Sequence, residues 1–485
     1  MRKKTKIIAT ISDLKCDIDF LQSLFDNGMN IVRINTAHAS FEGAKKVINN
    51  VRKVSDTIGI LIDTKGPEIR TQTLAKPFDV SYGDIIKIAG NKEKESTKDL
   101  IYVNYNYFVR DVSVGSKILI DDGDLELQVI KKQSDLLECM VMNKGTIKGR
   151  KSVNIPSANI KLPALSKKDI EFINFAVEQN LDFIAHSFVR NKADIIAVQT
   201  ILDSLSSDIK IIAKIENKEG VDNIEEILDM AYGVMVARGD LAVEISPEKL
   251  PVVQKKLVKI AIKRRKPVIV ATQMLHTMIE NPRPTRAEVN DIANAIYDGT
   301  DAIMLSGETA YGKYPLKSVQ MMKSIAKEVE SNTSTFRANL DSEALKRKGG
   351  RKLSSYDLIS AQLTKQAITA AEELDVKAII ADTTSGRTIR ALAAYRGKHT
   401  IYAQCYNKKT MRKLALSYGV HVNYIEATKS HTSFIKNALN NLIHKNTFKK
   451  ENLVLIIAGN FGRSTGASYL EVATVQNLLN VSENK

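Results

Sequence analysis

The feature of this sequence that most constrains its fold is an eightfold alternation of short apolar runs with amphipathic segments. Each run is rich in β-branched residues, which is typical of parallel strands buried under helices. The runs lie at 6–11, 30–35, 59–63, 182–187, 210–215, 233–237, 267–272 and 301–306. The segments between them predict helices at 19–26, 41–54, 167–178, 193–205, 220–231, 251–263, 285–297 and 316–330. Eight such units predict an α/β fold, the (β/α)8 TIM barrel, with its chemistry at the carboxyl ends of the strands.

One interval between the third and fourth runs departs from this rhythm. Between residues 71 and 163, apolar and polar residues alternate in the segments 84–88, 117–121, 125–129 and 137–141, and glycine and asparagine turns separate them. An alternation of period two is typical of strands with one buried face. We therefore predict a small antiparallel β-barrel domain inserted at 71–163, in a position to serve as a lid over the barrel mouth.

The last third of the chain returns to an α/β rhythm. Residues 336–355 are polar and rich in lysine and glycine, which predicts a linker. Apolar runs at 378–382, 399–403 and 453–459 then predict a mostly parallel sheet. The expected organisation is a catalytic barrel from 1–70 and 164–335, the inserted domain at 71–163, and a C-terminal α/β domain at 356–485.

Composition narrows the classes of partner. The net charge is +16, but 22 basic and 11 acidic residues lie within 339–485, so the excess is concentrated away from the barrel. No nucleic-acid motif appears and tryptophan is absent, so nucleic acid is not an expected partner. No apolar run approaches the roughly 18 residues of a membrane span, and no membrane partner is expected. Three cysteines without paired spacing indicate a reducing cytoplasm.

The most specific candidate site combines a lysine with two acidic residues. Lys214 and Glu216 are two positions apart on one predicted strand, so they face the same side. Asp240 follows the next strand, directly after Gly239, and two carboxylates on adjacent strand ends suit a hard cation such as Mg²⁺. The alternatives are a structural ion pair for the first two residues and a helix cap for Asp240.

A second group of polar residues follows the early strands. Arg33 and Asn35 share a strand face, while Asp63 and Thr64 end the next strand, so a guanidinium and several oxygen atoms converge on one corner. Hydroxyl groups end two later strands, where they are also common as caps, at Thr272 and Ser306.

Several long motifs carry a family resemblance. They are Asp-Thr-Lys-Gly-Pro-Glu-Ile-Arg-Thr at 63–71, Ala-Lys-Ile-Glu-Asn at 213–217, Met-Val-Ala-Arg-Gly-Asp-Leu at 235–241 and the stretch 270–315. Through these motifs, and over nearly the whole chain, the sequence resembles the pyruvate kinase family. The resemblance implies phosphoryl transfer from phosphoenolpyruvate to ADP. The alternative is a Mg²⁺-dependent (β/α)8 lyase acting on pyruvate or phosphoenolpyruvate.

The resemblance also implies roles for individual residues. Glu216 and Asp240 would hold Mg²⁺, or Mn²⁺ in its place, and Lys214 would stabilise the phosphoryl group in flight. Substrate contacts would come from Arg33, Lys214, Gly239, Asp240 and Thr272, with Thr272 beside the enolate and Ser306 as a proton relay. Nucleotide contacts would come from Asn35, His38, Arg70 and Lys151.

The monovalent-cation site is where this sequence departs from the family. The family has a serine oxygen ligand where this chain has Ala37, but Asn35, Asp63 and the Thr64 carbonyl remain. Glu68 also matches the K⁺-dependent type. We therefore expect activation by K⁺, with water or Thr36 in place of the missing oxygen.

The C-terminal domain carries one further candidate site. Thr383, Thr384, Ser385, Gly386, Arg387 and Thr388 form a turn between a predicted strand and a predicted helix, which offers hydroxyl and amide groups to an anion. An ordinary strand-to-helix turn is the alternative. The resemblance implies a phosphorylated allosteric effector at this turn, and a homotetramer.

Overall fold

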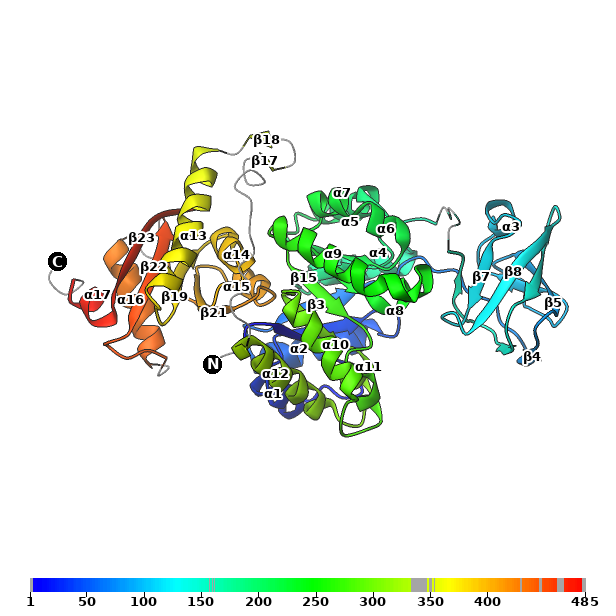
Figure 1. Cartoon of the computed structure of the whole chain (residues 1–485), viewed down its shortest axis with the longest axis horizontal. Coiled ribbons are helices and arrows are strands. Elements are labelled where there is room, and N and C mark those ends of the chain that lie inside the picture. The colour runs from blue at the N-terminus through cyan, green and yellow to red at the C-terminus, as the bar shows by residue number, and fades with distance from the viewer. Residues whose placement is uncertain are drawn as a thin grey trace.

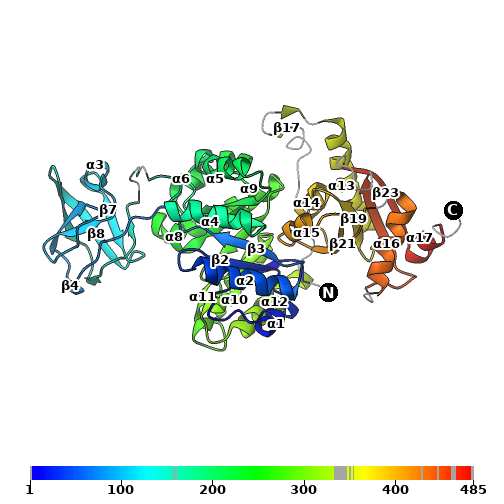
Figure 2. The same cartoon turned by 180° about the vertical axis from the view of Figure 1, so that it is seen from behind.

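Three bodies lie in a row in the computed structural model, which describes residues 3–156, 158, 160, 162–332, 347–348, 351–352, 354–427, 430–444, 447–459 and 466–481. A barrel occupies the middle, with the inserted domain at one end and the C-terminal domain at the other (Figure 1), and the view from behind shows the same order (Figure 2). Most of the predicted linker at 336–355 lies outside the described residues. Within it, β17 (Arg347–Lys348) pairs with β18 (Arg351–Lys352).

The eight predicted barrel strands are confirmed, with ends within one residue of the prediction. They are β1 (Lys6–Thr10), β2 (Ile31–Asn35), β3 (Gly59–Asp63), β12 (Phe183–His186), β13 (Lys210–Ile215), β14 (Gly233–Ala237), β15 (Val268–Ala271) and β16 (Ala302–Leu305). They close into a parallel barrel in the order β1-β16-β15-β14-β13-β12-β3-β2. Because all eight strands are parallel, their carboxyl ends meet at one mouth.

Several of the helices around the barrel begin at polar caps that the sequence provides. Ser166 and Thr285 each form a capping box, with Asp169 and Glu288 respectively. The helices are α1 (Ile18–Asp26), α2 (Phe41–Val54), α4 (Lys167–Glu178), α5 (Lys192–Ser204), α6 (Lys218–Asp222), α7 (Ile224–Met230), α8 (Arg238–Glu244), α9 (Leu250–Lys263), α10 (Arg286–Tyr297), α11 (Gly307–Ala310) and α12 (Pro315–Asn332), with 3₁₀ turns η1 (Pro247–Lys249) and η2 (His276–Ile279).

One helix prediction was wrong. The single helix expected at 220–231 is two helices, α6 and α7, which meet at Asn223. The Asn217 side chain caps α6 two residues earlier than expected, accepting from the Gly220 amide at 2.7 Å. The Asn223 side chain donates to the Arg190 carbonyl at 3.0 Å, which holds the chain at the break. Periodicity alone did not show this break because both pieces present apolar residues to the barrel.

The inserted domain has its own apolar core and consists of two sheets. Its elements are β4 (Phe78–Val80), β5 (Ile85–Gly90), β6 (Ile101–Val103), α3 (Phe108–Asp111), β7 (Lys117–Ile120), β8 (Leu125–Lys132), β9 (Leu137–Val141), β10 (Gly145–Ile147) and β11 (Val153–Asn154). A six-stranded sheet has the order β11-β7-β8-β9-β5-β6, and β10 pairs with β4. The predicted antiparallel strands are confirmed, with one parallel pair, β5 and β6.

The predicted, mostly parallel C-terminal sheet is also confirmed. Its order is β21-β20-β19-β22-β23, and only β23 is antiparallel to its neighbour. The elements are α13 (Ser355–Glu373), β19 (Ile379–Thr383), α14 (Arg387–Ala394), β20 (Ile401–Cys405), α15 (Lys408–Leu414), β21 (Val420–Tyr424), α16 (His431–His444), β22 (Leu453–Gly459), β23 (Ala467–Thr474) and α17 (Val475–Val481).

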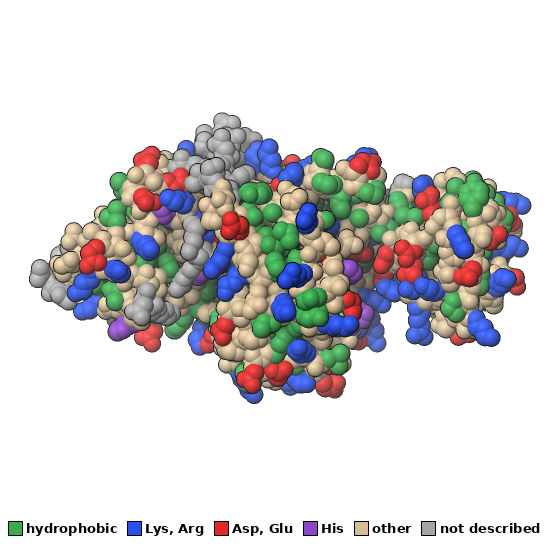
Figure 3. Space-filling view, turned by 60° about the horizontal axis from the view of Figure 1, so that its bottom comes forward, with side chains coloured by type: hydrophobic (Ala, Val, Ile, Leu, Met, Phe, Trp, Pro, Cys, Tyr) green, Lys and Arg blue, Asp and Glu red, His purple; other side chains and the backbone are tan. Residues whose placement is uncertain are grey.

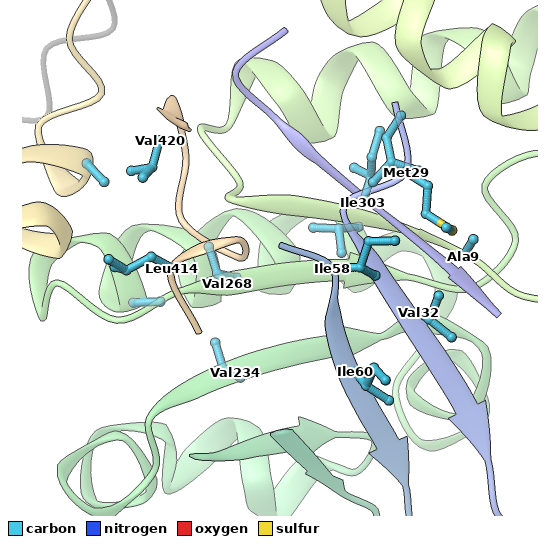
Figure 4. Packing of buried hydrophobic residues seen from close by; sticks show 14 of the residues in the cluster. Ala9, Met29, Val32, Ile58, Ile60, Val234, Val268, Ile303, Leu414 and Val420 are labelled. Carbon is cyan, nitrogen blue, oxygen red and sulfur yellow. The ribbon is translucent and has the colours of Figure 1, made fainter. Parts of the chain in front are cut away.

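The C-terminal domain packs against the floor of the barrel, opposite the mouth. Leu416 is fully buried in the same cluster as the side chains inside the barrel. Figure 4 shows Leu414 and Val420 of this domain near Val234 and Val268 of the barrel strands, all members of one apolar cluster. A buried ion pair also joins the two domains at this face: Arg412 of the C-terminal domain donates to Asp182 of the barrel at 2.6 Å. The C-terminal domain therefore covers the floor of the barrel, and the inserted domain lies beside the opposite end (Figure 1).

Candidate functional site

A buried lysine lies at the centre of the polar groups in the barrel mouth. Lys214, near the end of β13, has a side chain only 11% exposed. Its Nζ lies 2.9 Å from Glu216 Oε1 and 3.1 Å from Asp63 Oδ1, and it donates to Ser187 Oγ at 2.7 Å. Residues from three neighbouring strands, β3, β12 and β13, thus meet at one ammonium group.

Burial and charge act in opposite directions on these groups. Burial disfavours the ammonium form of Lys214, but the attraction of Asp63 and Glu216 outweighs it and raises the pKa of Lys214. Burial also disfavours the Asp63 carboxylate, but Lys214 and Arg33 outweigh it, so the pKa of Asp63 is lowered. Burial raises the pKa of Glu216 to about 7, since Lys214 is shared with Asp63 and Asp240 adds a repulsive charge. Asp63 is therefore compensated more fully than Glu216, because it has Arg33 as a second cationic partner.

Two carboxylates in this group fit a divalent cation. Glu216 and Asp240 follow β13 and β14, which are neighbours in the barrel, and partial burial raises the pKa of Asp240 as well. Lys214 and Arg33 supply two positive charges against three carboxylates, those of Asp63, Glu216 and Asp240, so one negative charge is left over. In the described part of the chain, no three His, Cys, Asp or Glu side chains cluster as a metal site. Glu216 and Asp240 would be the two acidic ligands of such a cation, and substrate or water would fill its other positions.

Arg33 is the second buried cation of the mouth. Its Nε and Nη2 both lie 2.7 Å from Asp63 Oδ2, and its Nη1 donates to Thr10 Oγ1 at 3.0 Å. The residue is 9% exposed. Because the carboxylate holds two guanidinium nitrogens, the arginine is fixed in orientation before any ligand arrives.

The corner expected to bind K⁺ retains its oxygen atoms. Asn35 lies opposite Asp63 in the register of β2 and β3. The Thr36 hydroxyl, a candidate for the missing ligand, donates to the Asp63 carbonyl at 2.8 Å. Lys168 Nζ donates to the Ala37 carbonyl at 3.3 Å, so a positive charge reaches the edge of this corner.

Thr272 and Gly239 are brought together at the ends of β15 and β14. Thr272 Oγ1 accepts from the Gly239 amide at 2.8 Å and donates to the Ala271 carbonyl at 2.6 Å. Thr272 and Gln273 have φ of 68° and 53°, a left-handed conformation that costs of order 1–3 kcal/mol for each such residue. Ser306 follows β16, the next strand, and its amide donates to Glu308 Oε2 at 2.7 Å.

Two of the residues expected at the nucleotide, Arg70 and Lys151, lie where the barrel joins the inserted domain. Arg70 and Ser152 form an isolated bridge, so Arg70 and Lys151 are on paired segments. Each of the two cations has an acidic partner at 2.8 Å, Glu68 for Arg70 and Asp121 for Lys151. His38 is exposed on the turn after β2. In the space-filling view, acidic and basic side chains gather along this junction (Figure 3).

The C-terminal turn at 383–388 is held by contacts of its own. Thr383 Oγ1 accepts from the Gly386 amide at 2.8 Å, and Gly386 has a φ of 78°. Thr410 Oγ1 donates to the Thr384 carbonyl at 2.8 Å, and Arg387 pairs with Asp357 of α13 at 2.7 Å. Ser385 and Arg387 are exposed, whereas Thr383 and Thr388 are buried.

Two residues at the mouth were missed by the sequence analysis. Ser187 is 2% exposed, and its Oγ donates to the Thr64 carbonyl at 2.6 Å in addition to its contact with Lys214. Arg238 is 6% exposed and reaches the Thr272 carbonyl at 2.7 Å. A hydroxyl at the end of the predicted strand 182–187 was a usable signal for Ser187. Arg238 had no such signal, since an isolated arginine after a strand is usually a surface charge.

The fold and the mouth together define a (β/α)8 enzyme with an inserted domain beside its active site and a set of groups suited to phosphate and a divalent cation. A family model for "Pyruvate kinase, barrel domain" matches residues 2–319, and one for "Pyruvate kinase, alpha/beta domain" matches 361–473. The chain belongs to the pyruvate kinase family, and it is therefore an enzyme of the phosphotransferase class.

Individual relatives agree with this assignment. The chain is 47% identical over 483 residues to the pyruvate kinase of Borreliella burgdorferi, covering 98% of each chain. It is 42% identical over 481 residues to that of Bacillus licheniformis, covering 98% of this chain and 80% of the relative. The crystal structure of a pyruvate kinase from Cryptosporidium parvum superposes with a TM-score of 0.88 at 34% identity, covering 98% of this chain and 96% of that chain. No helix in the described ranges is long and apolar enough to cross a membrane.

Proposed function

We propose that this chain transfers the phosphoryl group of phosphoenolpyruvate to ADP, giving pyruvate and ATP, and that it depends on Mg²⁺ and K⁺. The observation that carries the proposal is the buried Lys214 ammonium held by Asp63, Glu216 and Ser187 at the barrel mouth. Phosphoryl transfer needs positioning and charge neutralisation more than covalent chemistry, and this cluster supplies both.

The residues of the chain would divide the work as follows. Arg33, which Asp63 fixes in orientation, binds the phosphate of phosphoenolpyruvate. Lys214 stabilises the phosphoryl group as it passes from the oxygen of phosphoenolpyruvate to the oxygen of ADP. Glu216 and Asp240 would hold Mg²⁺, which would neutralise the oxygens that gain charge. The Asp240 amide binds the substrate carboxylate. The Gly239 amide, which donates to Thr272, would share that role only if the threonine hydroxyl turned away.

Protonation of the enolate would take place on the Thr272 side of the site. The Thr272 hydroxyl lies next to the segment that carries Asp240, and Ser306 follows the adjacent strand β16. This placement supports Thr272 as the group beside the methyl carbon and Ser306 as a relay from it. Asn35, Asp63 and the Thr64 carbonyl would bind K⁺, which brings a further positive charge to the phosphate-binding side of the mouth.

The nucleotide would bind between the barrel and the inserted domain. Arg70 and Lys151 lie on paired segments at this junction, and ADP phosphates would replace Glu68 and Asp121 as their partners. Asn35 and His38 complete the expected nucleotide contacts. A lyase acting on phosphoenolpyruvate has no need of these two cations, so their convergence favours the kinase.

A coupled assay of pyruvate formation tests the proposal directly. Phosphoenolpyruvate and ADP should give pyruvate and ATP, and omission of ADP, Mg²⁺ or K⁺ in turn should each lower the rate. Pyruvate formation that does not need ADP would refute the kinase and support the lyase. Full activity without any monovalent cation would refute the K⁺ site alone.

The remaining parts of the proposal concern regulation and assembly. We place the catalytic domain at 1–70 and 164–335, the lid at 71–163, and a regulatory domain at 356–485 in which the turn 383–388 binds a phosphorylated effector. Ser385 and Arg387, the exposed members of that turn, would make the first contacts. Activation by sugar phosphates or nucleotides tests the effector, and light scattering tests the homotetramer.

A location in the cytoplasm stays a prediction. The three cysteines are free and buried, as expected in a reducing compartment.

A further inference from the structure

Arg238 is a buried arginine next to the metal-binding segment. It stands directly before Gly239 and Asp240, at the end of β14, and is 6% exposed. Its side chain crosses to the end of the neighbouring strand β15 instead of extending into solvent. A buried guanidinium requires partners for its donors, and the identity of those partners indicates what it does.

Every nitrogen of this guanidinium has a partner. On the side of β15, Nη2 lies 2.7 Å from the Thr272 carbonyl and 2.8 Å from Met274 Sδ, and Nε lies 3.3 Å from the Ala271 carbonyl. On the other side, Nη1 lies 2.6 Å from Asp291 Oδ1 of α10, which is half-exposed, and 3.4 Å from Gln254 Oε1. The planar fork thus joins the outer helix layer to two carbonyls at the barrel mouth.

Those carbonyls belong to the segment that ends β15, and the backbone that follows has an unfavourable conformation. Thr272 and Gln273 have φ of 68° and 53°, and a β-branched residue with positive φ is a genuine outlier. Such a conformation persists only where the surroundings impose it. Arg238 donates to the Thr272 carbonyl at 2.7 Å, while the Thr272 hydroxyl accepts from the Gly239 amide at 2.8 Å. The two strand ends are therefore joined at two points.

We propose that Arg238 is a positioning residue that fixes the Thr272 hydroxyl relative to Asp240. The inference rests on the proposed function, in which Thr272 lies beside the carbon that is protonated. Asp291 holds the guanidinium from the outside, and the guanidinium holds the Thr272 turn in its left-handed conformation. Without it, Thr272 and Gln273 would relax toward ordinary dihedral angles, and the hydroxyl would leave its place next to the Gly239 amide.

Three variants and two rates test the role of Arg238. The variants are Arg238→Met, Arg238→Lys and Asp291→Asn. The rates are kcat for pyruvate formation and the exchange of pyruvate methyl hydrogens in D₂O with Mg²⁺, followed by proton NMR. In this exchange a C–H bond breaks to give the enolate and a proton that passes to solvent, and a C–D bond forms when the enolate is deuterated.

Arg238→Met should lower both rates by about 10²-fold, the usual cost of displacing a positioned group by about 1 Å, with a much smaller change in KM for phosphoenolpyruvate. Arg238→Lys should fall between this variant and the wild type, because an ammonium reaches one carbonyl but cannot form the fork. Asp291→Asn should lower the exchange rate several-fold. Asp229→Asn is the matched control, since it removes one of the two carboxylate partners of Arg264 on the outer helices and should change neither rate.

A purely structural Arg238 would lower the melting temperature while leaving exchange per folded molecule at the wild-type rate, and that result would overturn the proposal. If Arg238→Met does not fold, Arg238→Lys and Asp291→Asn decide the question, and wild-type exchange in both refutes the role. A wild-type protein that forms no pyruvate refutes the proposed function instead. The two failures are therefore distinct.

Discussion

Replacing Lys214 by methionine is the sharpest test of the active site. The ammonium contacts Asp63 and Glu216 at about 3 Å, and the phosphoryl group in flight would lie at a similar range. Two unit charges about 4 Å apart interact by about 4 kcal/mol at an effective dielectric constant of about 20. Loss of that interaction in the transition state corresponds to a fall in kcat of about 10³-fold. The KM for phosphoenolpyruvate should change far less, since Arg33 still binds the phosphate.

The assay is steady-state pyruvate formation with saturating Mg²⁺ and K⁺, together with a melting curve to establish that the variant is folded. Lys210→Met is the matched control, because Lys210 begins the same strand at the opposite end of the barrel and should be replaceable with little effect on kcat. A Lys214→Met variant that is folded and retains kcat within tenfold of the wild type would show that the ammonium does not act on the transferred group.

Three other predictions concern the metal site, the barrel floor and the pH dependence of stability. Asp240→Asn should weaken Mn²⁺ binding, measured by electron paramagnetic resonance, by at least about tenfold. Changing a residue that only orients a metal ligand already costs about that much, and Asp240 is expected to be a ligand itself. Unchanged affinity would contradict the assignment. Arg412→Met should lower the free energy of unfolding by about 3 kcal/mol, because Asp182 stays buried without one partner, whereas Lys408→Met at an exposed ion pair of the same helix should cost under about 1 kcal/mol. Burial lowers the pKa of His186 to about 4, from about 6.5 in the unfolded chain. Between these two pH values the unfolded chain binds a proton at this histidine and the folded chain does not. Stability should therefore fall by about 3 kcal/mol between pH 7 and pH 4, and in denaturant titrations His186→Leu should lose that part of the pH dependence.

The barrel could be predicted from sequence because each of its units is local. A strand buried on both faces must be apolar throughout, and a covering helix must have one apolar face, so both leave a readable pattern. The ends of the predicted strands agree with the structure within one residue. The break at Asn223 was missed because a change of helix direction leaves the apolar pattern on both sides intact.

The site could be predicted in part for the same reason. Residues two positions apart on a strand face the same side, so Lys214 was expected beside Glu216, and the structure brings their side chains to 2.9 Å. The contact of Lys214 with Asp63 at 3.1 Å was not predicted, because the two residues lie on strands far apart in sequence. The predicted TIM barrel implies the order of these strands, but the distances between their side chains were not available from local pattern. Ser187 makes its contacts with Lys214 and the Thr64 carbonyl only because β12 lies between β3 and β13.

The sequence by itself determined the eight repeated units, the interruption after the third strand and the residue types at each strand end, because these depend on neighbours along the chain. Only the tertiary structure decided which charges share a partner, and so why the pKa of Asp63 is lowered while that of Glu216 is raised. It also decided that Arg238 turns inward to hold Thr272. Such effects depend on distances of a few ångströms between segments far apart in sequence, and no local pattern records them.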